Sequence, residues 1–327
     1  MNRNTNDDKK KIMELLKTIK EGRWQLTQFK SGKTNTTLFC TNDDYKVVAK
    51  IYGKNTSDFI NREIEKSNIS YLHTYGLAPR IMASYENGFI IDYIPGKELQ
   101  EVEIQAHYEV IARKMRKWHT IKSSGVPTLF KTMLDWYWKA HVHHNSMLEN
   151  YNIYDFIIET ERKVKHCEVG FCHNDLLASN IIILNSPVCE KDLVISSISE
   201  TSARPMYEVD EVQFIDFEYS GPNYTAYDVA NHFAEYVGYS FDKSKMPSES
   251  FKQEFIRTYM YSGFTVNDKI IDDFLKDVNV FIPVSHCYWG LWALLKGQTK
   301  EKDFDYFKYA KFKLDLVNYK VKNHRSE

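Results

Sequence analysis

The chain has 327 residues, of which 43% are hydrophobic and 27% charged, as expected for a globular protein with a substantial core. Its 43 Lys and Arg against 44 Asp and Glu give a formal charge of −1, which excludes a general attraction to nucleic acid or to an anionic membrane. The five cysteines include no Cys-x-x-Cys pair, which argues against a disulfide framework and a zinc site. We find no signal peptide and no membrane span, and we expect a cytoplasmic protein with reduced thiols.

Residues 1–11 are polar, and apolar side chains at helical spacing predict a short amphipathic helix from Ile12 to Ile19. The next elements are, in chain order, strands at 24–30, 36–41 and Tyr45–Tyr52, a helix from about Ser57 to Tyr75, and strands at Ile81–Tyr85 and Phe89–Tyr93. Gly76 and Pro79 mark the end of that helix.

The motif Ile94-Pro95-Gly96-Lys97 breaks this pattern, and beyond about residue 100 helices dominate. Strands are predicted again at Ile181–Leu184 and Val212–Phe217, separated by a polar segment, 185–211, that reads as a long loop or hairpin without an assigned role. The sequence therefore predicts an α+β protein of two lobes: a small β-rich N-terminal lobe, 1–95, and a larger, mostly helical C-terminal lobe, 96–327.

A polar run, His173-Asn174-Asp175-Leu176-Leu177-Ala178-Ser179-Asn180, leads into the strand that starts at Ile181. Its spacing, His-x-Asp-x-x-x-x-Asn, is that of a kinase catalytic loop. In such a loop, Asp175 accepts the proton of a substrate hydroxyl and Asn180 reaches a metal ion on the phosphates. We expect His173 to support the loop by hydrogen bonds, without a role in proton transfer.

A second motif, Phe214-Ile215-Asp216-Phe217-Glu218-Tyr219, places an aspartate at the end of a short apolar strand. A kinase holds Mg²⁺ between the β- and γ-phosphates with an aspartate at this place. The two motifs occur in the order that phosphoryl transfer requires, so they predict a kinase with ATP and Mg²⁺ as cofactors.

The N-terminal lobe supplies candidate ATP-binding residues. Lys50 lies on a strand that looks like the Val-Ala-Ile-Lys strand of kinases, and Glu63 on the following helix could pair with it. Ser31-Gly32-Lys33-Thr34-Asn35 would cover the phosphates; it is not a Walker A loop, because Thr27 stands where that motif needs glycine. The candidate ATP-binding residues are Ser31, Gly32, Asn35, Lys50, Glu63, Asp92 and Tyr93.

From about Gly32 to its end, the chain resembles the choline/ethanolamine kinase family, which is similar in fold to aminoglycoside phosphotransferases and protein kinases. The most specific stretches are Ile215–Gly221, Asp228–Glu235 and Ser285–Trp292; the chain departs in having Ala230 for the family's glycine and a longer segment before Asp216. The resemblance implies a bilobal protein-kinase-like fold, Asp175 as base, Asn180 and Asp216 as Mg²⁺ ligands, a homodimer, and the first step of phospholipid synthesis by the CDP route.

The resemblance also implies an acceptor-binding site for choline or ethanolamine. Asp228 and Glu235 are seven residues apart, so on one helix they share a face, and Glu235 could supply a negative charge to a cationic amine. Aromatic faces and one carboxylate suit a quaternary ammonium, because cation–π contacts replace lost hydration. The acceptor-binding candidates are Tyr219, Glu235, Trp289, Trp292, Phe304 and Tyr309, with His173 and Asp228 as structural support.

Three other functions compete with this one. A small-molecule kinase of aminoglycoside phosphotransferase type would keep the phosphoryl-transfer residues but line its acceptor site with acidic groups. A protein kinase would carry Asp-Phe-Gly and Ala-Pro-Glu, whereas this chain has Asp216-Phe217-Glu218. A non-catalytic kinase-fold scaffold would not need every phosphoryl-transfer residue. The preference between choline and ethanolamine stays open at this point.

Overall fold

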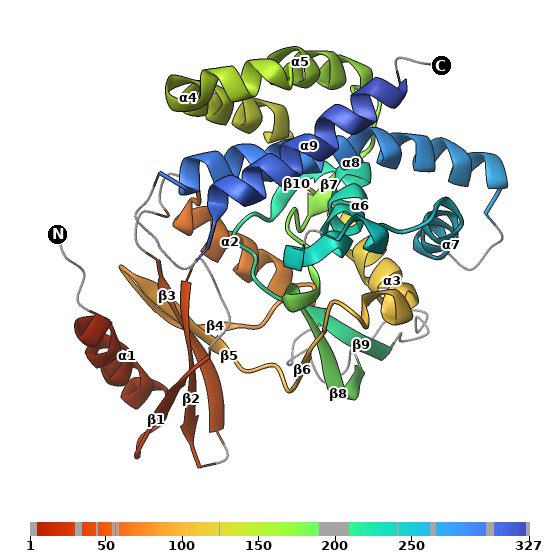
Figure 1. The fold of residues 1–327 in the computed structure, drawn as a ribbon. Coiled ribbons are helices and arrows are strands. Elements are labelled where there is room, and N and C mark those ends of the chain that lie inside the picture. Colours follow the sequence, from red (N-terminus) through yellow and green to blue (C-terminus); the bar gives the residue numbers. More distant parts are fainter. Residues whose placement is uncertain are drawn as a thin grey trace. The chain divides into compact units, whose positions relative to one another are not determined.

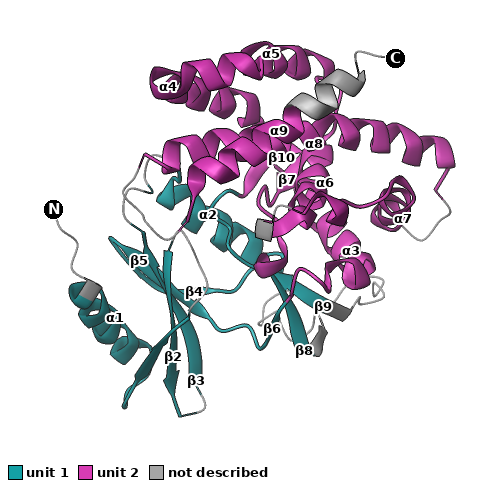
Figure 2. Ribbon diagram, in the orientation of Figure 1, with its two compact units in different colours: residues 1–98, 181–219 teal, residues 99–180, 220–327 magenta. Residues whose placement is uncertain are grey.

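The computed structural model describes residues 5–29, 35–43, 45–53, 56, 59–123, 125–189, 209–240, 242–261, 266–298 and 304–324. Contacts between Cα atoms divide the chain into two compact units, shown in Figure 2. Unit 1 consists of Met1–Glu98 and Ile181–Tyr219, and unit 2 of Leu99–Asn180 and Ser220–Glu327. Both units are discontinuous in sequence, whereas the predicted lobes are continuous; the lobe boundaries stay a prediction.

Unit 1 contains an antiparallel sheet in the order β1-β2-β3-β5-β4 (Figure 1). Its strands are β1 (Gln25–Gln28), β2 (Asn35–Asn42), β3 (Tyr45–Tyr52), β4 (Ile81–Tyr85) and β5 (Gly88–Asp92). The bounds of β3 and β4 are those predicted from the sequence, and the others differ by a few residues at the ends.

Two helices accompany this sheet. Helix α1 (Thr5–Ile19) begins well before the predicted start at Ile12, and acidic residues in its first turn complement the helix dipole. Its Ile12 and Leu16 are fully buried in a core with residues of β2, β3 and β5. Helix α2 (Arg62–His73) is shorter than predicted, because Asn61 caps it by accepting hydrogen bonds from the second and third backbone N–H groups.

Unit 1 also contains a three-stranded antiparallel sheet in the order β6-β8-β9. Its strands are β6 (Gly96–Glu98), β8 (Ile181–Cys189) and β9 (Val209–Phe214). Because β8 pairs directly with β9, the predicted loop or hairpin is a hairpin where it is described. Residues 190–208, the middle of the predicted 185–211 segment, lie outside the described residues.

Unit 2 is mostly helical, with one short antiparallel pair, β7 and β10. The elements are α3 (Tyr108–His119), α4 (Leu129–Asn150), α5 (Ile153–Lys163), β7 (Val169–Cys172), β10 (Gly221–Tyr224), α6 (Thr225–Ala234), α7 (Glu249–Met260), α8 (Asp268–Lys296) and α9 (Tyr306–His324). Within the described residues, 3-10 helices lie at Ile104–His107, Ala178–Asn180, Glu235–Ser240 and Lys243–Lys245. A β-sheet N-terminal region and a mostly helical remainder confirm the predicted α+β class.

Helix α8 is long and apolar enough, by length and composition, to cross a membrane. However, 89% of its most apolar stretch is buried inside the protein, against α6, α9 and α4. We therefore describe α8 as the central core helix of unit 2, which agrees with its course through the middle of the magenta unit in Figure 2.

Candidate active site

The predicted catalytic loop connects β7 to a 3-10 turn, Ala178–Asn180, at which β8 begins. Asn180 closes this loop, because its side-chain Nδ2 donates to the backbone oxygen of Asp175 at 2.8 Å. The backbone N–H of Asp175 faces His173 Nδ1 at 3.3 Å. Asn174 has a φ of 66°, a left-handed conformation that asparagine tolerates better than most residues. Local hydrogen bonds therefore set the backbone that carries Asp175.

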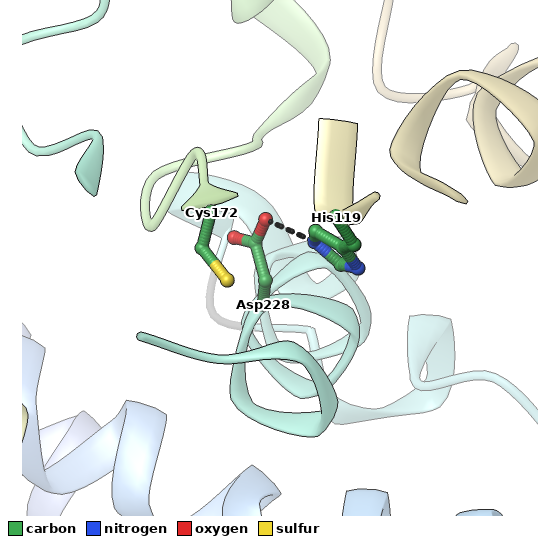
Figure 3. Close-up of side chains that lie close together, drawn as sticks. All are labelled: His119, Cys172 and Asp228. Atoms are coloured by element: carbon green, nitrogen blue, oxygen red, sulfur yellow. Dashed lines mark hydrogen bonds and ion pairs between the residues drawn. The ribbon is translucent and has the colours of Figure 1, made fainter. Parts of the chain in front are cut away.

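Asp228 on α6 anchors the start of the loop from within unit 2 (Figure 3). Its buried carboxylate accepts hydrogen bonds from the backbone N–H groups of His173, at 2.8 Å, and Asn174, at 2.7 Å. His119 at the end of α3 adds a third contact, from Nε2 at 2.9 Å, and its Nδ1 lies 2.7 Å from the Tyr259 hydroxyl. Burial alone would raise the pKa of Asp228, but the bond from His119 and the neighbouring groups lower it below its usual value.

His119, Cys172 and Asp228 bring three possible metal-ligand atoms within 4.8 Å of one another. Both carboxylate oxygens of Asp228 already accept hydrogen bonds, however. The Cys172 thiol donates to the backbone oxygen of Asn223 at 3.5 Å, and burial raises its pKa well above the usual value. We therefore interpret the group in Figure 3 as a hydrogen-bonded anchor for the loop.

His232 fixes the middle of the same loop. It is fully buried on α6, and its Nδ1 lies 2.9 Å from the backbone oxygen of Leu176. Burial lowers the pKa of His232 to about 4, so the ring is neutral at pH 7 and Nδ1 carries the proton that it donates to Leu176. Two residues of α6, Asp228 and His232, thus hold successive parts of the predicted catalytic loop.

In unit 1, Lys50 lies among three carboxylates. Its Nζ donates to Glu65 at 2.8 Å and to Asp216 at 2.6 Å, and Glu218 lies at 3.6 Å. Burial alone would lower the pKa of Lys50, but the Coulombic attraction of Asp216, then of Glu65 and Glu218, raises it above its usual range. Lys50 is therefore a permanent cation next to Asp216, the predicted metal ligand.

The predicted pairing of Lys50 with Glu63 is wrong. Glu63 is 84% exposed and pairs with Lys66 on the same helix, whereas the side chain of Glu65 is fully buried. The reason is helical spacing, since Glu65, Ile69 and Leu72 follow one another at four and three residues and share the buried face of α2. Glu63 lies in the first turn, beside the Asn61 cap, and points to solvent.

The charged cluster in unit 1 contains more carboxylates than cations. Arg62 donates to Glu65 at 2.8 Å and to Glu218 at 3.1 Å, so two cations face three carboxylates. Burial raises the pKa of Glu218, and the charge of Asp216 raises it further. Carboxylate oxygens of Glu65, Asp216 and Glu218 lie within 4.8 Å of one another, and oxygen ligands are those that Mg²⁺ prefers. Both oxygens of Glu65 already accept hydrogen bonds, from Lys50 and Arg62, so Asp216, whose side chain is 33% exposed, is the member of this group that fits the predicted magnesium role.

The remaining ATP-binding candidates lie at different places. Asn35 joins the charged cluster, because its side chain donates to Glu218 at 2.8 Å and accepts from Arg62 at 2.9 Å. Asp92 ends β5 and lies 3.5 Å from Arg80, and Tyr93 packs its ring on Phe39 with centroids 5.0 Å apart. Ser31 and Gly32 lie outside the described residues.

The aromatic acceptor-binding candidates form one chain of ring contacts in unit 2. Trp289 and Trp292 have ring centroids 5.6 Å apart, and Trp292 lies 5.7 Å from Tyr306. Phe304 continues the chain, at 5.0 Å from Tyr306 and 5.6 Å from Tyr309. The end of α8 and the start of α9 thus bring four predicted aromatic residues together, whereas Tyr219 belongs to unit 1.

Glu235 lies at the end of α6 and pairs with Lys313 on α9, with Nζ 2.7 Å from Oε1. Burial raises the pKa of Tyr227, and the charges of Asp175 and Glu235 both raise it further. Tyr227 packs on Tyr288, which in turn packs on Trp289 with ring centroids 5.2 Å apart. The charges of the predicted base and of the acceptor carboxylate thus both act on Tyr227, whose ring contacts lead to Trp289 within unit 2.

Sequence reasoning missed Glu65, Arg62, His119, His232 and Lys313. For Glu65 and Lys313 a signal existed, since each is a charged residue on the apolar face of its helix. Lys313 follows Tyr309 by four residues and precedes Val317 by four, and all three are buried. Nothing local in the sequence points to Arg62, whose contacts with Glu218 depend on tertiary structure.

Comparison with known proteins identifies the family. The family model for choline/ethanolamine kinase matches residues 26–318. Ethanolamine kinase 2 of Mus musculus is 30% identical over 95% of this chain and 80% of its own length.

Solved structures agree with this assignment. The ethanolamine kinase of Plasmodium vivax, at 26% identity and a TM-score of 0.76, covers 90% of this chain and 82% of its own. An aminoglycoside phosphotransferase, at 13% identity and a TM-score of 0.61, covers 94% and 98% and shows the fold alone. The predicted kinase-like fold is confirmed, and the chain belongs to the choline/ethanolamine kinase family.

Proposed function

We propose that this protein transfers the γ-phosphoryl group of MgATP to the hydroxyl group of ethanolamine or choline. The observation that carries the proposal is that one compact unit holds the Asp175 loop, Glu235 and the aromatic chain that contains Trp289 and Trp292. A carboxylate with aromatic faces suits a small organic cation, and a carboxylate on a fixed loop suits the removal of a hydroxyl proton.

In this mechanism Asp175 accepts the proton of the acceptor hydroxyl, and the bonds from Asn180, His173 and the Asp228 anchor hold its loop in place. MgATP supplies the phosphoryl group and the positive charge that stabilises it during transfer. The proposed metal ligands are Asp216 of unit 1 and Asn180 of unit 2, whose side-chain oxygen makes no hydrogen bond within the described residues. Lys50, held by Glu65, would bind phosphate oxygens.

The same residues argue against a polycationic acceptor such as an aminoglycoside, which needs several carboxylates around its amines. Within the described part of unit 2, the aromatic chain has Glu235 beside it, and Lys313 partly neutralises that charge. A single small cation fits this arrangement better. The cytoplasmic location and the homodimer stay predictions.

The test is turnover of ethanolamine and choline by the purified protein with MgATP, measured side by side as kcat/KM. We predict that Asp175→Asn lowers kcat by roughly 10²–10⁴-fold, the usual contribution of a general base, and leaves ATP binding unchanged. Calorimetric titration with ATP is the control for folding and nucleotide binding. If the variant keeps half of the wild-type kcat, Asp175 is not the base; if the wild type uses neither amino alcohol, the proposed function is wrong.

A further inference from the structure

Lys313 and Glu235 form an ion pair that is buried on both sides. The Lys313 Nζ lies 2.7 Å from Glu235 Oε1, and the side chains are 0% and 9% exposed. Removing two charges from water is expensive, and an apolar pair of similar size is often at least as stable. Stability alone is therefore a poor reason for an ion pair at this place.

The surroundings of the pair point to the acceptor. The Lys313 ammonium lies 5.3 Å from the ring centroid of Tyr309, one of the aromatic acceptor-binding candidates. Tyr309 packs on Phe304 at 5.6 Å, so Glu235 lies at the end of the aromatic chain. A carboxylate and aromatic faces are also the groups that recognise an alkylammonium ligand.

The pair leaves half of the carboxylate available. Lys313 contacts Oε1, and within the residues that the structure describes Glu235 Oε2 takes part in no hydrogen bond or ion pair. A carboxylate offers about four lone-pair directions on its two oxygens, so it can serve two cations at once. Oε2 is then the atom to which the ammonium end of an acceptor would bind.

We propose that Lys313 is a positioning residue for the acceptor: it fixes Glu235 through Oε1, so that Oε2 faces the cationic end of the acceptor. The inference rests on the proposed function, because it assigns a role within the same site. A rotatable side chain without a partner has no fixed direction, and a charged partner holds a carboxylate more strongly than a neutral one does. Lys313 is that charged partner.

The proposed role of Lys313 predicts different effects on the KM of the amino alcohol and on the KM of ATP. Lys313 touches the acceptor carboxylate, whereas the candidate ATP-binding side chains of unit 1 belong to another part of the chain. Loss of Lys313 should therefore raise the KM of the amino alcohol and leave the KM of ATP nearly unchanged. A purely structural link between α9 and α6 would instead lower stability without changing either KM.

The experiment compares Lys313→Met, Lys313→Arg and Lys311→Met by steady-state kinetics with ethanolamine, choline and ATP. Lys311→Met is the matched control, since Lys311 lies on the same helix but is exposed and pairs with Asp315. For Lys313→Met we expect the KM of the amino alcohol to rise about tenfold or more, with kcat at saturation within about threefold. Lys313→Arg should restore the KM to within about threefold, because its guanidinium also donates to Oε1.

Each outcome of this experiment either supports or contradicts the positioning role of Lys313. A folded Lys313→Met with the wild-type KM for the amino alcohol, or with a lower one, overturns the inference. So does an equal rise in both KM values. If Lys313→Met does not fold, Lys313→Gln, which keeps an N–H donor without the charge, is measured in its place with the same expectation. A wild type that phosphorylates neither amino alcohol refutes the proposed function, which the kinetics of the wild type show before any variant is made.

Discussion

Two single residues of α6 connect the helical core to the loop that carries Asp175. Asp228 binds the first two backbone N–H groups of the loop, and His232 binds the backbone oxygen of Leu176. Both side chains are buried and both use only one protonation state for these bonds: the aspartate must be ionised and the histidine neutral. The loop that carries Asp175 is therefore sensitive to the protonation of groups that never touch a substrate.

His232 gives a prediction about pH. Burial lowers its folded-state pKa to about 4, below the value near 6.5 of an unfolded histidine. As the pH falls between these values, the unfolded chain binds a proton that the folded chain does not, so the unfolding free energy decreases. This contribution is fully present above pH 6.5 and is lost toward pH 4; its size is about 3 kcal/mol at most.

The measurement is urea unfolding at several pH values between 7 and 4, for the wild type and for His232→Asn. The asparagine amide can still donate toward the Leu176 oxygen but does not titrate. Subtracting the pH dependence of the variant's unfolding free energy from that of the wild type therefore removes the contribution of the carboxylates. We expect the wild type to lose more stability than the variant in this range. Parallel curves would mean that His232 has the same pKa in the folded and the unfolded protein, contrary to the prediction.

At the scale of elements, the sequence predicted best where periodicity and turns agree. Strands β3 and β4 have the predicted bounds, because β3 reads as a compact apolar strand and Gly88 closes the turn after β4. Strands β7 and β10 were not predicted, since Gly170, Gly221 and Pro222 weaken any strand pattern there and each strand exists through its partner. The start of helix α1 was predicted too late, because its first turns are polar and show no apolar periodicity.

The candidate site shows the same division. The motifs around Asp175 and Asp216 could be identified because their spacing is local. Glu65, Arg62 and Lys313 act through partners distant in sequence: Lys313 lies 78 residues from Glu235, and Arg62 lies 156 from Glu218. No pattern within one segment can predict such a contact. A charged residue on an apolar helix face indicates only that it has some partner.

Helix α2 gives a prediction that uses two glutamates of the same element. Glu65→Gln removes a charge that holds the Lys50 Nζ at 2.8 Å, whereas Glu63→Gln changes an exposed residue that pairs with Lys66. We expect Glu65→Gln to lower kcat/KM for ATP by about tenfold or more, because the kinase lysine needs its glutamate in place. Glu63→Gln should stay within about twofold of the wild type, as exposed ion pairs contribute little.

Kinetics at varied ATP and saturating ethanolamine or choline measure this, with thermal unfolding as a control for folding. Equal effects of the two substitutions would mean that helix stability, and not the contact with Lys50, sets the ATP dependence. A normal Glu65→Gln would show that Asp216 and Glu218 suffice to hold Lys50.

At the scale of the whole molecule, the hairpin β8–β9 belongs to a different unit from the segments that precede and follow it in the sequence. It follows the catalytic loop directly, yet its contacts are with unit 1. β6 pairs with β8, and the Gln213 side chain donates to the backbone oxygen of Leu77 at 2.6 Å. The backbone N–H of Asn185 donates to the oxygen of Pro95 at 3.1 Å. A division at residue 95 would cut the bonds to Leu77 and Pro95, although it would leave β6 with β8.

These contacts predict which amides become exposed to solvent together. Native-state hydrogen exchange at increasing denaturant reports cooperative units, each with its own free energy of opening. We expect the paired amides of β8 and β9 to lose protection together with those of β3 and β5, because they belong to one compact unit. The amides of β7 and β10 serve as the internal control and should follow α8. If the β8–β9 amides lose protection together with α8, or if all amides open in one step, the division into these units does not govern unfolding. If they lose protection together with β3, the tertiary contacts of a segment, and not its position in the sequence, decide with which unit it unfolds.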